Sequence, residues 1–167
     1  MFYDTISSPI GNLLLLSSDA GLKKIIFSDH QNNISPNLNW IKDSFKLKEV
    51  KDQLLAYFHQ ELTQFNLMLA PDGTAFQKSI WKELQQIPYG TICSYQDIAN
   101  SIGKPNACRA VGMANSLNPI PIIIPCHRVI GKNGKLTGYA GGLETKAKLL
   151  IIENIQMPND FTQFKLF

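Results

Sequence analysis

The chain has few cysteines and no long apolar run, and both absences narrow its class. Among its 167 residues only Cys93, Cys108 and Cys126 are cysteines, and no two of them form a Cys-x-x-Cys pair. This odd number and spacing argue against a disulfide framework and a thiolate-rich metal site. No apolar run approaches the roughly 18 residues needed to cross a bilayer, and the N-terminus lacks the basic-then-apolar pattern of a secretion signal. We therefore expect a cytoplasmic protein with free thiols, no metal and no membrane partner.

Charge is sparse but unevenly distributed along the chain. Charged residues make up 17% of the sequence and hydrophobic residues 44%, as in an ordinary globular protein. Residues 1–73 contain six Lys and Arg against eight Asp and Glu, whereas residues 74–153 contain nine against four. A basic second part favours an anionic partner, most commonly nucleic acid. The alternative is that lysines on solvated helix faces happen to cluster there.

The first part of the chain predicts a small sheet with one packed helix. Short apolar runs at 2–7, 11–17 and 22–27 are separated by turn residues, which is typical of an antiparallel meander. Residues 50–62 then change to helical spacing through Leu54, Leu55, Phe58 and Leu62, and residues 30–39 are typical of a loop. Pro71 and Gly73 interrupt both patterns. We therefore predict an α+β protein with domains at 1–73 and 74–167.

The second part predicts helices with clear ends. Thr74 and Gln77 form a capping box before the apolar stripe of Phe76, Ile80, Trp81 and Leu84, and Pro88 and Gly90 end that helix. A second helix begins at Ser94 and stops at Gly103, and a third covers about 107–115. Two short helices joined by a Gly-containing turn indicate a helix-turn-helix unit, with the second helix presented to DNA. Helical hairpins also occur in proteins that never bind nucleic acid.

The third predicted helix combines small residues with one arginine. Ala107, Ala110, Gly112 and Ala114 give it a slim profile, suited to close approach to DNA or to tight helix packing. Arg109 is either a surface arginine or a group that contacts phosphate or fills the gap left by an extruded base.

A thiol and an imidazole stand side by side after the apolar run 120–124, in Pro125-Cys126-His127-Arg128-Val129. The thiolate is the reacting form of cysteine, and a neighbouring imidazole can generate it. The alternative is that Cys126 is a small buried hydrophobe.

Two further features follow the Cys-His pair. The segment 131–142 is rich in glycine, which lets backbone approach a ligand closely, and its Tyr139 is either a packing residue or a group that stacks on a base. Glu153 follows four apolar residues, and burial of a carboxylate is costly without a partner. We therefore predict a Cys126-His127-Glu153 relay.

The segment from Asn118 to Val129 resembles the active-site motif of the O6-alkylguanine-DNA alkyltransferases. Further matching residues occur in the family's order and spacing: Trp81, Tyr89-Gly90, Ser94-Tyr95, 107–112 with Arg109, and 139–143. The resemblance is strong over about 76–153 and general before it. It implies a winged helix-turn-helix and DNA repair by irreversible, single-turnover transfer of an alkyl group from O6 of guanine to Cys126, without cofactors.

The resemblance also implies a role for each matching residue. Cys126 accepts the alkyl group, His127 takes its proton through a water, Glu153 holds the imidazole, Asn118 braces this network and Tyr95 donates a proton to N3 of the guanine. The base pocket is lined by Val129, Tyr139, Ala140 and Tyr95. DNA docks through its minor groove, with the guanine flipped out, against Arg109, Ala107, Ala110, Gly112, Asn115 and Ser94. A monomer is expected, and cooperativity and activity on O4-alkylthymine stay open.

The chain departs from the family pattern in two places. Ala140 replaces the serine of some members, so a hydroxyl contact to O6 is absent. No cysteine precedes Cys93, so the N-terminal zinc site of some members is not expected. The length indicates the stand-alone repair form without a fused regulatory module.

Three other functions remain to be weighed against this one. A non-enzymatic binder of alkylated DNA would keep the fold without the acceptor, and the presence of Cys126 counts against it. A helix-turn-helix transcription factor would bind with strong sequence preference. A thiol hydrolase is the weakest of these alternatives.

Overall fold

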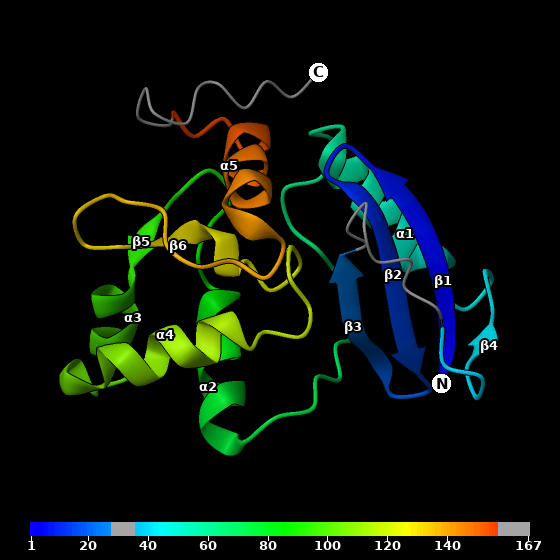
Figure 1. Cartoon of the computed structure of the whole chain (residues 1–167), viewed down its shortest axis with the longest axis horizontal. Helices are drawn as coiled ribbons and strands as arrows, with labels where there is room; N and C mark the ends of the chain where they lie inside the picture. Colours follow the sequence, from blue (N-terminus) through cyan, green and yellow to red (C-terminus); the bar gives the residue numbers. More distant parts are fainter. Residues whose placement is uncertain (28–35, 157–167) are drawn as a thin grey trace. The chain divides into compact units, whose positions relative to one another are not determined.

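The computed structural model describes residues 1–27 and 36–156. The chain divides into two compact units, Met1–Asp72 and Gly73–Phe167 (Figure 1). The first unit contains the main sheet, and the second contains most of the helices. The predicted α+β fold class is confirmed.

The sheet of the first unit is built from three consecutive antiparallel strands. These are β1 (Phe2–Ser8), β2 (Gly11–Ser18) and β3 (Gly21–Phe27), which confirm the predicted meander. A two-residue strand, β4 (Ile41–Lys42), which the sequence did not predict, pairs in parallel with β1, so that the strand order is β3-β2-β1-β4. Gly21 starts β3 with φ of 128°, and a Cβ there would lie 2.4 Å from the Met68 carbonyl oxygen. Only glycine fits this approach.

One helix, α1 (Lys48–Phe58), packs on this sheet (Figure 1). The predicted end at Leu62 is wrong, because the chain leaves the helix after Phe58 and Gln60 adopts φ of 61°. The predicted stripe is also shifted: Leu55 is exposed, and the buried residues are Val50, Leu54, Tyr57 and Phe58. The predicted loop at 30–39 lies partly outside the described residues.

The second unit opens with three short helices. Helix α2 (Ala75–Leu84) begins with the predicted capping box, in which Thr74 and Gln77 exchange hydrogen bonds of 2.8 and 3.2 Å. Helix α3 (Tyr95–Ser101) is capped by Ser94, and Gly103 follows it with φ of 69°. A 3-10 turn, η1 (Pro105–Ala107), leads into α4 (Cys108–Ser116). The buried Trp81 indole donates to the Ala114 carbonyl at 2.8 Å and fixes α2 against α4.

A minimal parallel sheet joins two distant parts of the second unit. Strand β5 (Cys93–Ser94) immediately precedes α3, and β6 (Val129–Ile130) immediately follows the 3-10 turn η2 (Cys126–Arg128). Cys93 pairs with Val129, and Ser94 pairs with Ile130. The last helix, α5, covers Gly142–Ile152 rather than the predicted 143–154, so Glu153 is its C-cap residue. No helix in the described ranges is long and apolar enough to cross a membrane.

Candidate active site

The approach to Cys126 is a tight turn held by Asn118. The Asn118 side chain accepts from the Ile120 amide at 3.0 Å and donates to the Ile124 carbonyl at 2.8 Å, so it bridges both ends of the turn. Between them, the buried Ile122 has φ of 76°, a conformation that is costly for a β-branched residue. Asn118 therefore holds a strained turn immediately before the cysteine.

Cys126 is a free thiol at the start of η2, and only 4% of it is exposed. Burial raises the pKa of this thiol to about 11, although the Asn118 side chain, the charge of Lys146 and two backbone amides act in the opposite direction. The resting group is therefore the neutral thiol, which needs a base before it can react.

His127 and Glu153 are brought together as predicted, since His127 Nε2 lies 2.7 Å from Glu153 Oε1 and both residues are buried. Burial lowers the pKa of His127, with the carboxylate of Glu153 acting against that shift. A neutral imidazole that donates through Nε2 keeps an unprotonated lone pair on Nδ1. The Nδ1 atom is buried and has no hydrogen-bond partner among the described residues. The ring is thus oriented as a base.

Glu153 has a second partner that the sequence did not reveal. Arg128 donates from Nε to Glu153 Oε2 at 2.8 Å and from Nη2 to Oε1 at 2.9 Å, while its Nη1 donates to the Ile87 carbonyl at 2.6 Å. The Gly90 amide also donates to Oε2, at 3.2 Å. Burial alone would raise the pKa of Glu153, but the hydrogen bonds from His127 and Arg128 outweigh it and lower the pKa to about 2. Glu153 is therefore ionised at neutral pH.

Lys146 is a second functional candidate that sequence reasoning missed. Its side chain is fully buried, and Nζ donates to the Val129 carbonyl at 2.6 Å and to the Thr137 carbonyl at 2.9 Å. The available signal was spacing, because Lys146, Leu150 and Glu153 recur along one face of a helix. Arg128 could also have been found from the sequence. A buried carboxylate at Glu153 was predicted to require a partner, and a nearby arginine is a suitable one, but the prediction named only His127.

Tyr95 reaches this region because β5 pairs with β6 immediately before α3 starts. Thr137 Oγ1 donates to the Tyr95 phenol oxygen at 2.9 Å. Burial raises the pKa of Tyr95, partly offset by that hydrogen bond. A Cβ on Gly112 would lie 3.8 Å from the Tyr95 ring, so α4 passes directly beside it. Tyr139 is half-buried, and Ala140 is exposed.

The predicted DNA-binding residues fall into two groups. Arg109 and Ala110 are exposed on α4, and Ala107 and Gly112 are half-buried. Asn115 is only 2% exposed, so its place on the predicted docking surface is wrong: it lies on the inward side of α4 with Val111 and Ala114. The Ser94 hydroxyl is engaged in the α3 cap through Asp97. Met113 on α4 and Leu117 at its C-cap, which the sequence analysis did not single out, are 62% and 52% exposed.

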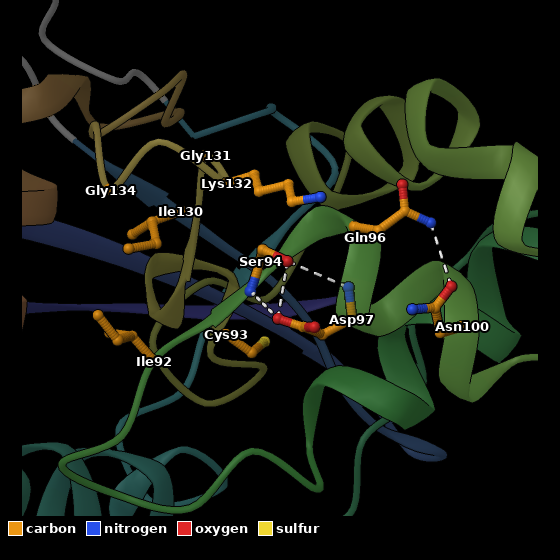
Figure 2. Close-up of a pocket in the computed structure, with 10 residues that line it drawn as sticks. All are labelled: Ile92, Cys93, Ser94, Gln96, Asp97, Asn100, Ile130, Gly131, Lys132 and Gly134. Atoms are coloured by element: carbon orange, nitrogen blue, oxygen red, sulfur yellow. Dashed lines mark hydrogen bonds between the residues drawn. The ribbon is translucent and has the colours of Figure 1, made fainter.

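A separate pocket of about 430 Å³, lined by both polar and apolar residues, lies beside α3. Figure 2 shows Ser94 and Asp97 joined by hydrogen bonds at its edge, with Lys132 extending from the loop after β6. The pKa of Asp97 is lowered, first by hydrogen bonds from Ser94 and then by the charge of Lys132. Cys126 does not line this pocket.

Within the part of the chain that the structure describes, no group of three or more His, Cys, Asp and Glu residues is arranged to hold a metal ion.

Comparison with known proteins assigns both units to one family. The family model described as 6-O-methylguanine DNA methyltransferase, DNA binding domain, matches residues 75–155, and the model for the ribonuclease-like domain matches residues 1–71. The chain belongs to the 6-O-methylguanine DNA methyltransferase family. This family member is 54% identical to the methylated-DNA–protein-cysteine methyltransferase of Methanosarcina barkeri, over 92% of this chain and 97% of that protein.

A solved structure and a further relative agree with this assignment over nearly the whole chain. It matches the crystal structure of Mycobacterium tuberculosis OGT in complex with DNA with a TM-score of 0.85 and 46% identity, covering 99% of this chain and 100% of the other. The methylated-DNA–protein-cysteine methyltransferase of Mycobacterium tuberculosis strain H37Rv is 48% identical over 162 residues. The helix-turn-helix is therefore part of a methyltransferase-family DNA-binding domain, and the transcription-factor alternative falls away.

Proposed function

We propose that this protein repairs DNA by transferring a methyl or other alkyl group from O6 of guanine to the sulfur of its own Cys126. The observation that carries the proposal is the orientation of His127. Its Nε2 is fixed on an ionised Glu153, and its Nδ1 keeps an unshared lone pair next in sequence to a buried thiol. Family membership supplies the substrate class.

The reaction moves one proton away from sulfur and one alkyl group onto it. His127 Nδ1 takes the thiol proton through a water, and Glu153 stabilises the resulting imidazolium. The thiolate attacks the alkyl carbon, the new C–S bond forms, and the bond from that carbon to O6 breaks. Tyr95 donates a proton to N3 of the departing guanine, so the leaving group is the neutral base. The thioether at Cys126 is stable, so each molecule acts once.

The base pocket is formed around the same residues. The backbone carbonyls of Cys126 and Val129 accept from the exocyclic amine of guanine, and Tyr139 and Ala140 lie on the O6 side. Because Ala140 has no hydroxyl, only its backbone amide can donate to O6. A carbonyl oxygen has two lone pairs, so Val129 can accept from the base while it accepts from Lys146.

DNA docks on the exposed face of α4. Arg109 is the exposed cation of that helix, and the basic balance of residues 74–153 favours phosphate contacts. The target carbon is inaccessible inside a duplex, so the guanine is flipped out and Arg109 occupies its place in the stack. We assign docking and chemistry to residues 74–167 and a structural role to residues 1–73. A cytoplasmic monomer is sufficient for this reaction.

Mass spectrometry tests substrate, acceptor and stoichiometry together. Incubation with duplex DNA containing O6-methylguanine should add one methyl mass to the peptide that contains Cys126, with one methyl per protein molecule. Cys126→Ala should bind the same DNA without gaining mass. Unmodified Cys126 after incubation of folded, DNA-bound protein would refute alkyl transfer.

A further inference from the structure

Lys146 carries a buried charge that the proposed proton relay does not use. Its ammonium is held by the carbonyls of Val129 and Thr137. No carboxylate in the described ranges lies within ion-pair distance of it, whereas the buried charges of Arg128 and Glu153 offset each other. An ammonium buried without a counter-ion is costly. The residue therefore needs an explanation beyond packing.

The position of Lys146 places that charge close to the reacting sulfur. Val129 follows η2 directly, and η2 begins at Cys126 and packs on α5, the helix that carries Lys146. The two groups act on each other's ionisation. Burial lowers the pKa of Lys146 to about 8, and the charge of the Cys126 thiolate acts against that shift. The charge of Lys146 in turn lowers the pKa of Cys126.

We propose that the Lys146 ammonium is the counter-charge against which the Cys126 thiolate forms, which makes Lys146 an electrostatic positioning residue of the reaction. The inference rests on the proposed alkyl transfer. Among the described residues, Lys146 from α5 and Tyr95 from α3 act on the charge of Cys126, and the neighbouring His127 and Arg128 of η2 are paired with Glu153. Lys146 alone among them is a cation without a carboxylate partner in the described structure.

The charges balance through each step. When His127 takes the thiol proton, a thiolate and an imidazolium form, and Lys146 and Glu153 offset them respectively. Attack on the alkyl carbon turns the thiolate into a neutral thioether, and the negative charge leaves with guanine until Tyr95 protonates it. The Lys146 charge thus favours the one state in which sulfur is negative.

A lower thiol pKa also makes the thiolate a weaker nucleophile, so the net effect must be weighed. Each pKa unit gives ten times more thiolate while the pKa is above the working pH, and a Brønsted coefficient of about 0.4–0.5 removes roughly a factor of three. The net gain is about threefold in rate for each unit.

The same ammonium restrains the loop next to Tyr95. Lys146 binds the Thr137 carbonyl, and the Thr137 hydroxyl binds the Tyr95 phenol. Loss of Lys146 can therefore slow the reaction by loosening Tyr95 alone. The decisive readout is alkylation of the thiol by a small reagent whose leaving group needs no proton from Tyr95, because this loosening would not slow it.

The rate at which iodoacetamide alkylates Cys126 in unreacted protein, measured below pH 8 where Lys146 is charged, tests the proposal. A Cys93→Ser/Cys108→Ser background leaves Cys126 as the single thiol, and the same protein with Cys126→Ser gives the background rate. Lys146→Met should slow both this alkylation and single-turnover methyl transfer by at least threefold, and Lys146→Arg should recover part of both. An unchanged alkylation rate in folded Lys146→Met would overturn the proposal.

A second measurement needs no substitution at Lys146. Carbon NMR of the lysine side chain in the intact protein should show a charged Lys146 at neutral pH, and a neutral amine there would refute the counter-charge role. Neither measurement uses DNA. A parent protein whose Cys126 reacts with iodoacetamide and whose Lys146 is charged, but which takes no methyl group from DNA containing O6-methylguanine, would count against the proposed function. A Lys146→Met protein that transfers the methyl group at the parent rate would count against Lys146.

Discussion

Arg128 and Glu153 form a two-pronged ion pair in the interior of the second unit, with both carboxylate oxygens accepting from the guanidinium at 2.8 and 2.9 Å. The side chains are 7% and 0% exposed. Since the same carboxylate orients His127, the arginine fixes the position of the relay without touching the thiol.

Removal of Arg128 should destabilise the protein strongly. Arg128→Met leaves the Glu153 charge buried with one fewer partner, and breaking a buried pair in this way costs about 3–5 kcal/mol. Arg128→Lys should recover little, because an ammonium cannot make both hydrogen bonds. Urea unfolding measures the loss. Lys148→Met, which breaks the more exposed Lys148–Glu144 pair, is the control and should cost less than about 1 kcal/mol.

Neutralising Glu153 should separate chemistry from DNA binding. Glu153→Gln keeps the shape of the side chain but removes the charge that stabilises the imidazolium of His127, so single-turnover methyl transfer should slow by about tenfold or more. Affinity for DNA containing O6-methylguanine should stay within about twofold, because Glu153 is buried. Rapid-quench kinetics and fluorescence anisotropy give the two values. An unchanged rate would remove Glu153 from the mechanism.

Acid should remove the contribution of Glu153 to stability in a defined window. The pKa of Glu153 is about 2 in the folded protein, against an ordinary value of 4.5. The unfolded chain therefore binds more protons between these values, and stability falls as pH drops from about 4.5 toward 2. The full contribution, about 3 kcal/mol, is present above that window. Urea midpoints of the parent protein and Glu153→Gln should converge as pH falls, and parallel curves would contradict the pKa shift.

Alkali should affect Lys146 and Cys126 in opposite directions. The pKa of Lys146 falls from 10.5 to about 8 on folding, so the unfolded chain keeps this proton longer and stability rises with pH between about 8 and 10.5. The pKa of Cys126 rises from 9.0 to about 11, which lowers stability between those values. Lys146→Met should therefore lose more stability than the parent between pH 8 and 10. If the stabilities of the two proteins declined in parallel over this pH range, the pKa of Lys146 would not be shifted by folding.

The exposed face of α4 predicts two kinds of DNA contact that salt can separate. Arg109→Ala should weaken binding and reduce the slope of log affinity against log salt by about one, as expected for one lost phosphate contact. Met113→Ala should weaken binding with no change of slope, because apolar side chains contact the minor groove without releasing counterions. Phe45→Ala, in the other unit and 88% exposed there, should change neither value. A Met113→Ala protein that binds normally would exclude Met113 from the interface.

The sequence predicted those features that depend on local pattern or on a necessary partner. The three long strands, the Thr74 cap and the meeting of His127 with Glu153 all follow from periodicity, capping chemistry or the cost of a buried carboxylate. Strands of two residues, such as β4, β5 and β6, carry no periodic signal, so their pairing was not predicted. Lys146 and Arg128 were missed because charged side chains are usually exposed, and their partners are carbonyls and a carboxylate that only the folded chain brings near.

The pairing of β5 with β6 also determines which insertions between Tyr95 and Cys126 the fold can tolerate. The chain leaves this ladder at Tyr95 and returns to it directly after Cys126 and its 3-10 turn. The spacing between the phenol and the thiol is thus tied to the register of two adjacent strands rather than to the number of residues in the excursion between them. Gly103 is exposed, and a Cβ there would meet no described atom within 4 Å. Extra residues inserted at this glycine would lengthen the helix-turn-helix while leaving Tyr95 and Cys126 in register.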